Sequence, residues 1–243
     1  MEIRIDREQL FKSVSRVQSI IERKSNMPIL STILLKASGN SVFLSATDLE
    51  IGFQQNIPAD IVSEGSITVS GRKLFEILKE STKENFQIKE KENNWVFLSD
   101  GLARFDLACL AADEYPSFVE PEDVSMVEVD GEILSEMINK TIYSVTVEEA
   151  GFKLSGVFTE KVEQEGVSFL RMVATDGHRL SMIDKDLKKV DSLGLGSGVM
   201  IPKKGMSELN KLSSEGGTIQ IGFKQKNCVA KKDNALIVMR LLE

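Results

Sequence analysis

The chain has 243 residues, with 30 Lys and Arg against 37 Asp and Glu, which gives a formal net charge of −7. This length suits one large domain or two smaller ones. A hydrophobic content of 42% is enough to build packed cores and excludes an intrinsically disordered chain. The acidic balance argues at first against a protein that coats nucleic acid, because such proteins carry a basic excess.

The rarer residues exclude further classes. Two cysteines, Cys109 and Cys228, without a CxxC motif exclude a disulfide framework and a zinc ribbon. A single histidine, His178, excludes a metal site built from two or more histidines, and we expect neither a metal nor a cofactor. The sequence shows no signal peptide and no apolar run of membrane-spanning length, which predicts a cytoplasmic protein that does not bind membranes.

In the first half, the pattern predicts helices at residues 7–24 and 71–80. Apolar residues of the first helix recur at every third or fourth position, which is typical of a helix with one buried face. Between the helices, Ile33–Leu44 runs as strands into the tripeptide Ala46-Thr47-Asp48. Three alternating strands complete this half, at Phe86–Ile88, Trp95–Leu98 and Ala103–Leu110.

The second half repeats this order of elements, with helices predicted at residues 131–143 and 203–213. Phe152–Val173 runs as a longer hairpin, whose polar tip is predicted at Glu160–Gly166, into Ala174-Thr175-Asp176. This tripeptide lies 128 residues after the first one. The last three predicted strands are Thr218–Ile221, Cys228–Ala230 and Ala235–Leu241.

The chain therefore predicts two copies of one unit of about 120 residues. The acidic, proline-containing stretch Asp113–Asp123 has loop composition and joins them, so we place the repeats at residues 1–122 and 123–243. Grouped strands with two helices per unit predict an α+β fold with mainly antiparallel sheets, not a doubly wound sheet.

Charge is divided unevenly between the predicted elements. The four helix windows hold 12 basic and 7 acidic residues, a net +5, which leaves −12 for the rest of the chain. If the helices share one side of the sheets, that side attracts phosphates, because local potential outweighs net charge. Few aromatic residues interleave with these cations, which favours sequence-independent backbone contact over base stacking. A solvated helix surface of mixed charge is the alternative interpretation.

The segment Val173–Ser181 holds the most distinctive motif, A-T-D-G-H-R-L. It resembles the signature of the bacterial sliding clamp, the beta subunit of DNA polymerase III. Further motifs match the family in the same order, namely Met27–Leu30, Ala46–Glu50, Asp113–Pro116 and Val199–Gly205. The resemblance covers the whole chain and implies tandem DNA clamp units, whose helices line a hole. The family has three such repeats, so we expect the third (C-terminal) repeat to be absent here.

The resemblance also implies a function. It predicts a non-catalytic processivity subunit that encircles duplex DNA without sequence specificity, near the nucleoid. Its implied partners are DNA polymerase III, the clamp loader and other proteins with a clamp-binding peptide. Family rings close head to tail between a first and a third repeat, so we expect this two-repeat form not to make a stable closed ring.

Two sets of site residues follow from the resemblance. The peptide-binding groove maps onto apolar walls and polar or flexible positions, namely Leu154, Thr175, Gly177, His178, Arg179 and Leu180. The DNA contacts map onto basic residues, namely Arg23, Lys24, Arg72, Lys73, Lys153, Lys203 and Lys204. Glu148 and Phe152 also fall at family DNA-contact positions but are not the residue types expected there.

Two alternative functions stay open at this point. The first is a hydrolase that uses Asp176 and His178, and the second is a protein-binding scaffold with no DNA role. The duplication argues against the hydrolase, because the first copy has Leu49-Glu50 where the second has Gly177-His178. Equivalent aspartates at positions 48 and 176 favour a structural turn over catalysis.

Overall fold

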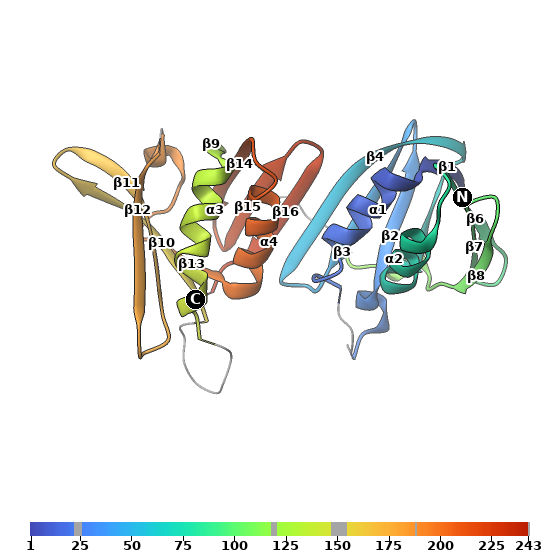
Figure 1. Ribbon diagram of the computed structural model, residues 1–243, viewed down its shortest axis with the longest axis horizontal. Coiled ribbons are helices and arrows are strands. Elements are labelled where there is room, and N and C mark those ends of the chain that lie inside the picture. The colour runs from blue at the N-terminus through green and yellow to red at the C-terminus, as the bar shows by residue number, and fades with distance from the viewer. Residues whose placement is uncertain (22–25, 118–120, 147–154, 188, 243) are drawn as a thin grey trace. The chain divides into compact units, whose positions relative to one another are not determined.

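The computed structural model describes residues 1–21, 26–117, 121–146, 155–187 and 189–242. The chain divides into two compact units, unit 1 (Met1–Val119) and unit 2 (Glu120–Glu243). In the described residues, each unit contains two α-helices on antiparallel strands (Figure 1). The predicted α+β fold with two helices per repeat is confirmed.

In unit 1, the helices α1 (Arg7–Arg16) and α2 (Gly71–Glu80) lie against each other. Each begins at a residue whose side chain accepts a hydrogen bond from the first turn. Asp6 accepts from the Gln9 amide at 2.8 Å, and Ser70 accepts from the Lys73 amide at 3.5 Å. Such caps satisfy amides that would otherwise lack a partner at a helix N-terminus.

The strands of unit 1 form one antiparallel series in the order β8-β7-β6-β1-β4-β3-β2-β5. The long strand β4 links two groups, because residues 52–58 pair with β3 and residues 59–63 pair with β1. The strands are β1 (Glu2–Asp6), β2 (Thr32–Ser38), β3 (Ser41–Thr47), β4 (Ile51–Ser63), β5 (Gly65–Ser70), β6 (Asn85–Lys91), β7 (Trp95–Ser99) and β8 (Arg104–Ala108).

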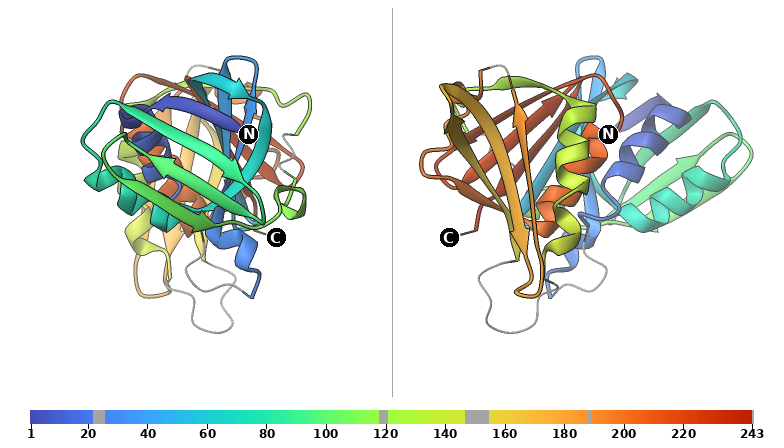
Figure 2. Two further views of the ribbon diagram at one scale, coloured as in Figure 1. Left: turned by 90° about the vertical axis from the view of Figure 1, so that its right-hand side faces the viewer. Right: turned by 60° about the vertical axis from the view of Figure 1, so that its left-hand side comes forward.

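In unit 2, the helices α3 (Gly131–Asn139) and α4 (Lys203–Ser213) lie side by side along the sheets (Figure 2). Asp130 caps α3 by accepting hydrogen bonds from the amides of Glu132 and Ile133. Helix α4 has no side-chain cap, and its first amide, that of Lys203, donates to the Ser155 carbonyl at 3.0 Å.

Unit 2 has two four-stranded antiparallel groups, β12-β11-β10-β13 and β16-β15-β14-β9. Helix α4 packs against strands of both groups. The strands are β9 (Val127–Asp130), β10 (Gly156–Gln164), β11 (Val167–Thr175), β12 (Leu180–Asp186), β13 (Val199–Pro202), β14 (Thr218–Lys224), β15 (Asn227–Lys232) and β16 (Ala235–Arg240).

Some predicted boundaries are wrong. Helix α1 ends at Arg16, not residue 24, and α3 ends at Asn139, not residue 143. Near both ends, hydroxyls bond back to carbonyls four residues earlier, as Ser15 does to Phe11 at 2.6 Å and Thr141 to Met137 at 2.9 Å. Such bonds compete with the regular helix. The hairpin tip is also shorter than predicted, because β10 continues to Gln164 and only Glu165-Gly166 turn the chain.

Tyr115 anchors the end of unit 1. Its side chain is buried beside Ile29 and Leu30, and its hydroxyl lies 3.4 Å from the Thr32 carbonyl and 3.3 Å from the Ser45 carbonyl. Burial raises the pKa of this phenol well above its usual value, so it stays a neutral donor. The motif Asp113-Glu114-Tyr115-Pro116 therefore fixes the chain as it leaves unit 1.

Candidate functional site

A tight turn carries most of the predicted peptide-binding residues. The Thr175 hydroxyl donates to the Arg179 carbonyl at 2.7 Å and accepts from the Gly177 amide at 3.1 Å. The Asp176 carboxylate accepts from the amides of His178 and Arg179, each at 3.0 Å. Gly177 has a φ of +85°, a conformation that glycine adopts without strain. The turn thus presents the side chains of His178 and Arg179 between β11 and β12, and Leu180 begins β12.

Unit 1 contains the same turn. The Thr47 hydroxyl donates to the Ile51 carbonyl at 2.9 Å and accepts from the Leu49 amide at 3.0 Å. The Asp48 carboxylate accepts from the amides of Glu50 and Ile51 at 3.0 and 2.6 Å. The predicted structural role of both aspartates is confirmed. Leu49 adopts a φ of +76° at the glycine position, where a leucine is strained.

Asp176 is unsuited to the general acid or base of a hydrolase. The amides of His178 and then Arg179 hold the pKa of its carboxyl below the usual value. Its second oxygen accepts from Arg179 Nε at 3.0 Å, so both oxygens are engaged. Since Asp48 makes the same backbone bonds without a neighbouring histidine, the carboxylate builds the turn. The hydrolase interpretation is therefore left without an aspartate that could act in catalysis.

The turn lies beside exposed apolar side chains. Leu180 is 65% exposed, and Met182, two residues further along β12, is 55% exposed. Because alternate residues of a strand share a face, these two form one apolar strip. Sequence reasoning missed Met182, although its spacing from Leu180 was the available signal. Leu154, the other predicted wall, lies outside the described residues, as do Arg23, Lys24, Lys153, Glu148 and Phe152.

A second missed residue is Tyr143, in a short 3-10 turn (Ile142–Ser144) after α3. Its carbonyl accepts a hydrogen bond from Arg179 Nη2 at 3.1 Å, and its ring centroid lies 5.5 Å from the guanidinium carbon. Tyr143 is 55% exposed. The sequence pattern predicts it at the end of a helix, residues 131–143, and assigns it no role.

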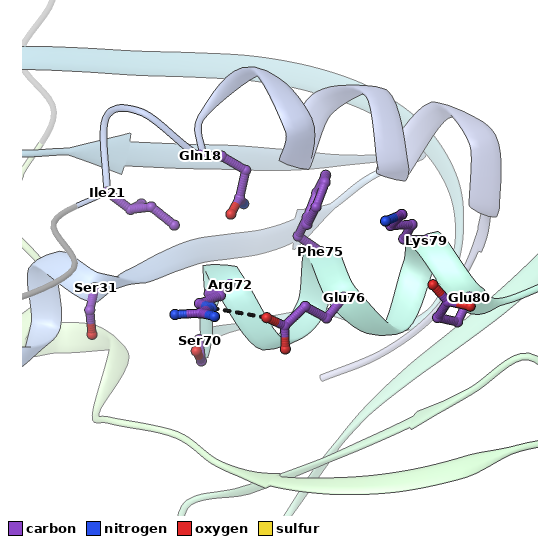
Figure 3. A pocket seen from close by; sticks show the side chains of 9 residues that line it. All are labelled: Gln18, Ile21, Ser31, Ser70, Arg72, Phe75, Glu76, Lys79 and Glu80. Atoms are coloured by element: carbon purple, nitrogen blue, oxygen red, sulfur yellow. Dashed lines mark hydrogen bonds and ion pairs between the residues drawn. The ribbon is translucent and has the colours of Figure 1, made fainter.

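Among the predicted DNA contacts, Arg72 lines a cleft of about 620 Å³ between α2 and the chain that follows α1 (Figure 3). Its Nε donates to Glu76 Oε1 at 2.9 Å, one turn along α2. The next residue, Lys73, is exposed on the same helix. The cleft is lined by Gln18, Ile21, Ser31, Ser70, Arg72, Phe75, Glu76, Lys79 and Glu80.

The two predicted lysines of α4 differ. The Lys203 ammonium donates to the Val145 carbonyl at 3.1 Å and is partly buried, so it is engaged within unit 2. Lys204 is exposed. Of this pair, Lys204 therefore has the more exposed side chain.

The charge division is smaller than the sequence predicted, because α1 and α3 are shorter. The four observed helices hold nine basic and six acidic residues, a net +3, which leaves −10 for the rest of the chain. The helices of unit 1 hold six basic against three acidic residues, whereas those of unit 2 hold three of each. The excess of positive charge on the helices thus belongs to unit 1.

Two features of the described residues bear on other classes of function. No group of three or more His, Cys, Asp and Glu side chains there is arranged to hold a metal ion. No helix in the same part of the chain is long and apolar enough to cross a membrane.

The paired units, each with two helices on antiparallel sheets and one shared turn, define a DNA clamp fold. Two family models match in series: the N-terminal domain of the DNA polymerase III beta subunit over residues 1–119, and its central domain over residues 128–243. The chain belongs to the DNA polymerase III beta subunit family.

Individual relatives agree with this assignment. A beta sliding clamp of Caulobacter vibrioides is 32% identical over 220 residues, which cover 89% of this chain and 58% of the relative. One from Pseudomonas aeruginosa is 31% identical, covering 88% of this chain and 57% of the relative. The chain thus spans less than two thirds of the length of these curated relatives.

Solved structures match over the whole chain. The DNA polymerase sliding clamp of Caulobacter crescentus has a TM-score of 0.93 and 29% identity, covering 100% of this chain and 66% of that one. A clamp from Bartonella birtlesii, solved bound to griselimycin, has a TM-score of 0.92 and 30% identity, covering 100% of this chain and 65% of that one.

Proposed function

We propose that this chain forms part of a non-catalytic sliding clamp that surrounds duplex DNA without reading its sequence. The clamp tethers DNA polymerase III, the clamp loader and repair factors, and works in the cytoplasm at the nucleoid. The observation that carries the proposal is the match of the entire chain to solved polymerase clamps at a TM-score of 0.93. We also propose repeat boundaries at residues 1–122 and 123–243.

The DNA-facing surface is the helix surface of the two units. Exposed cations of α2 and α4, such as Arg72, Lys73 and Lys204, supply sequence-independent contacts with phosphates. Lys203 contributes less, because its ammonium is engaged by Val145. Arg23, Lys24 and Lys153 remain predicted DNA contacts.

A salt titration of duplex binding tests this role. Affinity should fall as salt rises, and Lys73→Gln should lower the slope of log affinity against log salt by about 1. Lys36→Gln is the matched control, because it removes the same charge from an exposed position on the strand β2 of the same unit. Equal effects of the two variants, or no salt-dependent binding at low ionic strength, would favour the DNA-independent scaffold.

The peptide-binding surface is formed by Thr175, Gly177, His178, Arg179 and Leu180, with Leu154 as a further predicted member. The exposed strip of Leu180 and Met182 offers an apolar anchor point next to the polar turn. Because a matched clamp was solved with griselimycin, griselimycin is a suitable probe for this chain. Leu180→Ser should weaken its binding roughly ten-fold.

Leu49→Ser is the control for the peptide-binding test. It removes an exposed leucine from the corresponding turn of unit 1, and it should leave griselimycin affinity unchanged. His178→Ala should weaken binding without abolishing it. Equal losses for Leu180→Ser and Leu49→Ser would show that the probe does not bind at the turn of unit 2.

Ring assembly has a candidate surface in unit 1. Within the described residues of that unit, β8 pairs with β7 on one side only. Nearby Leu102 and Phe105 are 70% and 37% exposed. Edges of this kind pair readily with other chains, so we propose that β8 meets another subunit in the head-to-tail ring. Because the partner surface in such a ring is a third repeat, Phe105→Glu should reduce association of this chain with a three-repeat clamp of the family in sedimentation runs, and an unchanged profile would count against this edge.

A further inference from the structure

Arg179 is held unusually firmly for an exposed side chain. Its Nε donates to Asp176 Oδ2 at 3.0 Å, its Nη2 donates to the Tyr143 carbonyl at 3.1 Å, and the Tyr143 ring lies 5.5 Å from its guanidinium carbon. The side chain is nevertheless 59% exposed. A guanidinium has five N–H donors, so these contacts leave others directed to solvent.

These contacts add little to stability. Exposed ion pairs contribute little, because solvent screens them and ordering long side chains opposes them. An exposed tyrosine ring beside the arginine buries only part of its apolar surface. We therefore expect the fixed position of Arg179 to matter for ligand binding, because a side chain that is already ordered loses less entropy when a ligand arrives.

The first unit shows that the turn does not need this arrangement. Buried positions of α1 and α3 correspond at a spacing of 124 residues, as Leu10 does with Leu134 and Val14 with Ile138. This spacing places Ser19 where unit 2 has Tyr143. At the turn, Ile51 stands where unit 2 has Arg179, yet the four hydrogen bonds made by the threonine and aspartate side chains are the same. The Tyr143–Arg179 pair is therefore an addition specific to unit 2.

We propose that Tyr143 is a positioning residue of the peptide-binding surface. Its ring and carbonyl, together with Asp176, hold Arg179 so that the remaining N–H groups face an acceptor on a peptide anchored at Leu180. That acceptor is a main-chain carbonyl or a carboxylate, since guanidinium N–H groups pair with both. This inference rests on the proposed peptide-binding function and adds a residue on a different element.

Binding of griselimycin to the full chain tests the role of the ring. Tyr143→Leu keeps the apolar bulk and the carbonyl but removes the aromatic face, and it should weaken binding roughly two- to five-fold. Tyr143→Phe retains the ring and should restore wild-type affinity. Val167→Ala is the control, because it trims another exposed apolar residue of unit 2 at the far end of the β10–β11 hairpin.

The possible results separate the two proposals. If Leu180→Ser weakens binding while Tyr143→Leu does not, the peptide surface stands and the role of Tyr143 is refuted. If the wild-type chain does not bind the probe, the peptide-binding function fails, and with it the role of Tyr143. If Tyr143→Phe binds as weakly as Tyr143→Leu, the hydroxyl and not the ring face is the important group, which also contradicts the proposal.

A measurement without ligand tests the positioning step directly. In the nuclear magnetic resonance spectrum, the Arg179 Nε–H of the wild-type chain should be rigid and slow to exchange with water. Tyr143→Leu should make it mobile, whereas the amides of Gly177 and His178 should keep their shifts because the turn persists. An Arg179 side chain equally mobile in both proteins would overturn the proposal.

Discussion

The turns at residues 47–51 and 175–179 are two copies of one backbone structure with different surfaces. In both, a threonine hydroxyl and an aspartate carboxylate make the same four hydrogen bonds. Unit 1 presents Leu49 and Glu50, whereas unit 2 presents Gly177 and His178. The difference teaches that threonine and aspartate determine the shape of the turn, while the neighbouring residues determine what it can bind.

The two helix pairs likewise share a backbone arrangement but differ in the side chains that join them. Phe11 of α1 stacks on Phe75 of α2, with ring centroids 5.4 Å apart. In unit 2, the polar residues Ser135, Asn139 and Asn210 form a closed triangle of hydrogen bonds between α3 and α4. The same helix arrangement is thus joined by apolar contact in one unit and by amide and hydroxyl groups in the other.

The largest effect is expected from removing the aspartates that both turns share. Asp48→Ala and Asp176→Ala each leave two amides without their charged acceptor, which should lower the free energy of unfolding of the unit that carries the change. Urea unfolding followed by the fluorescence of Trp95, the single tryptophan, reports unit 1. Amide hydrogen exchange in β11 and β12 reports unit 2. If only one of the two variants lowered the stability of its own unit, the two turns would not be equivalent in energy.

The glycine position should give smaller effects of opposite sign. Leu49→Gly relieves a strained φ of +76° and should stabilise unit 1 by about 0.5–1 kcal/mol. Gly177→Leu introduces the same strain and should destabilise unit 2 by about 1 kcal/mol. A Cβ at Gly177 has no atom within 4 Å, so strain and not a clash is tested. Changes of equal sign in the two units would contradict the strain argument.

The sequence predicted the elements that rest on local patterns. Apolar periodicity and the repeated tripeptide located all four helices and the shared turn. It misplaced the end of α1, because back-bonding by Ser13 and Ser15 is not visible in a periodicity argument.

The sequence patterns did not predict contacts between residues far apart in the chain. Tyr143 meets Arg179 across 36 positions of the chain, and no local pattern signals that contact. The predicted helix at residues 131–143 includes Tyr143, whereas the structure places Tyr143 in a separate turn after α3. Met182 was missed for a related reason, because its exposure depends on which face of β12 is covered. Aligning the two halves at a spacing of 124 residues would have singled out Tyr143 opposite Ser19.

The smallest expected effect concerns pH and again separates the units. Glu136 on α3 pairs with Lys140 and with Lys185 of β12, both at 2.6 Å. These hydrogen bonds, first that of Lys140 and then that of Lys185, lower the pKa of Glu136 from 4.5 to about 2. Its stabilising contribution should therefore be complete above pH 4.5 and disappear as the pH falls towards 2.

Unit 1 lacks this pH-dependent link, since the 124-residue spacing places Lys12 opposite Glu136 and the 128-residue spacing places Ile57 opposite Lys185. A carboxyl titration by nuclear magnetic resonance should find Glu136 near pH 2, and Lys185→Gln should raise that value only part of the way to 4.5, because Lys140 remains. Acid should then loosen α3 from β12 before α1 loosens from β4, as amide exchange would report. A Glu136 that titrates near 4.5 in the wild-type chain would mean that the link between α3 and β12 does not form in solution.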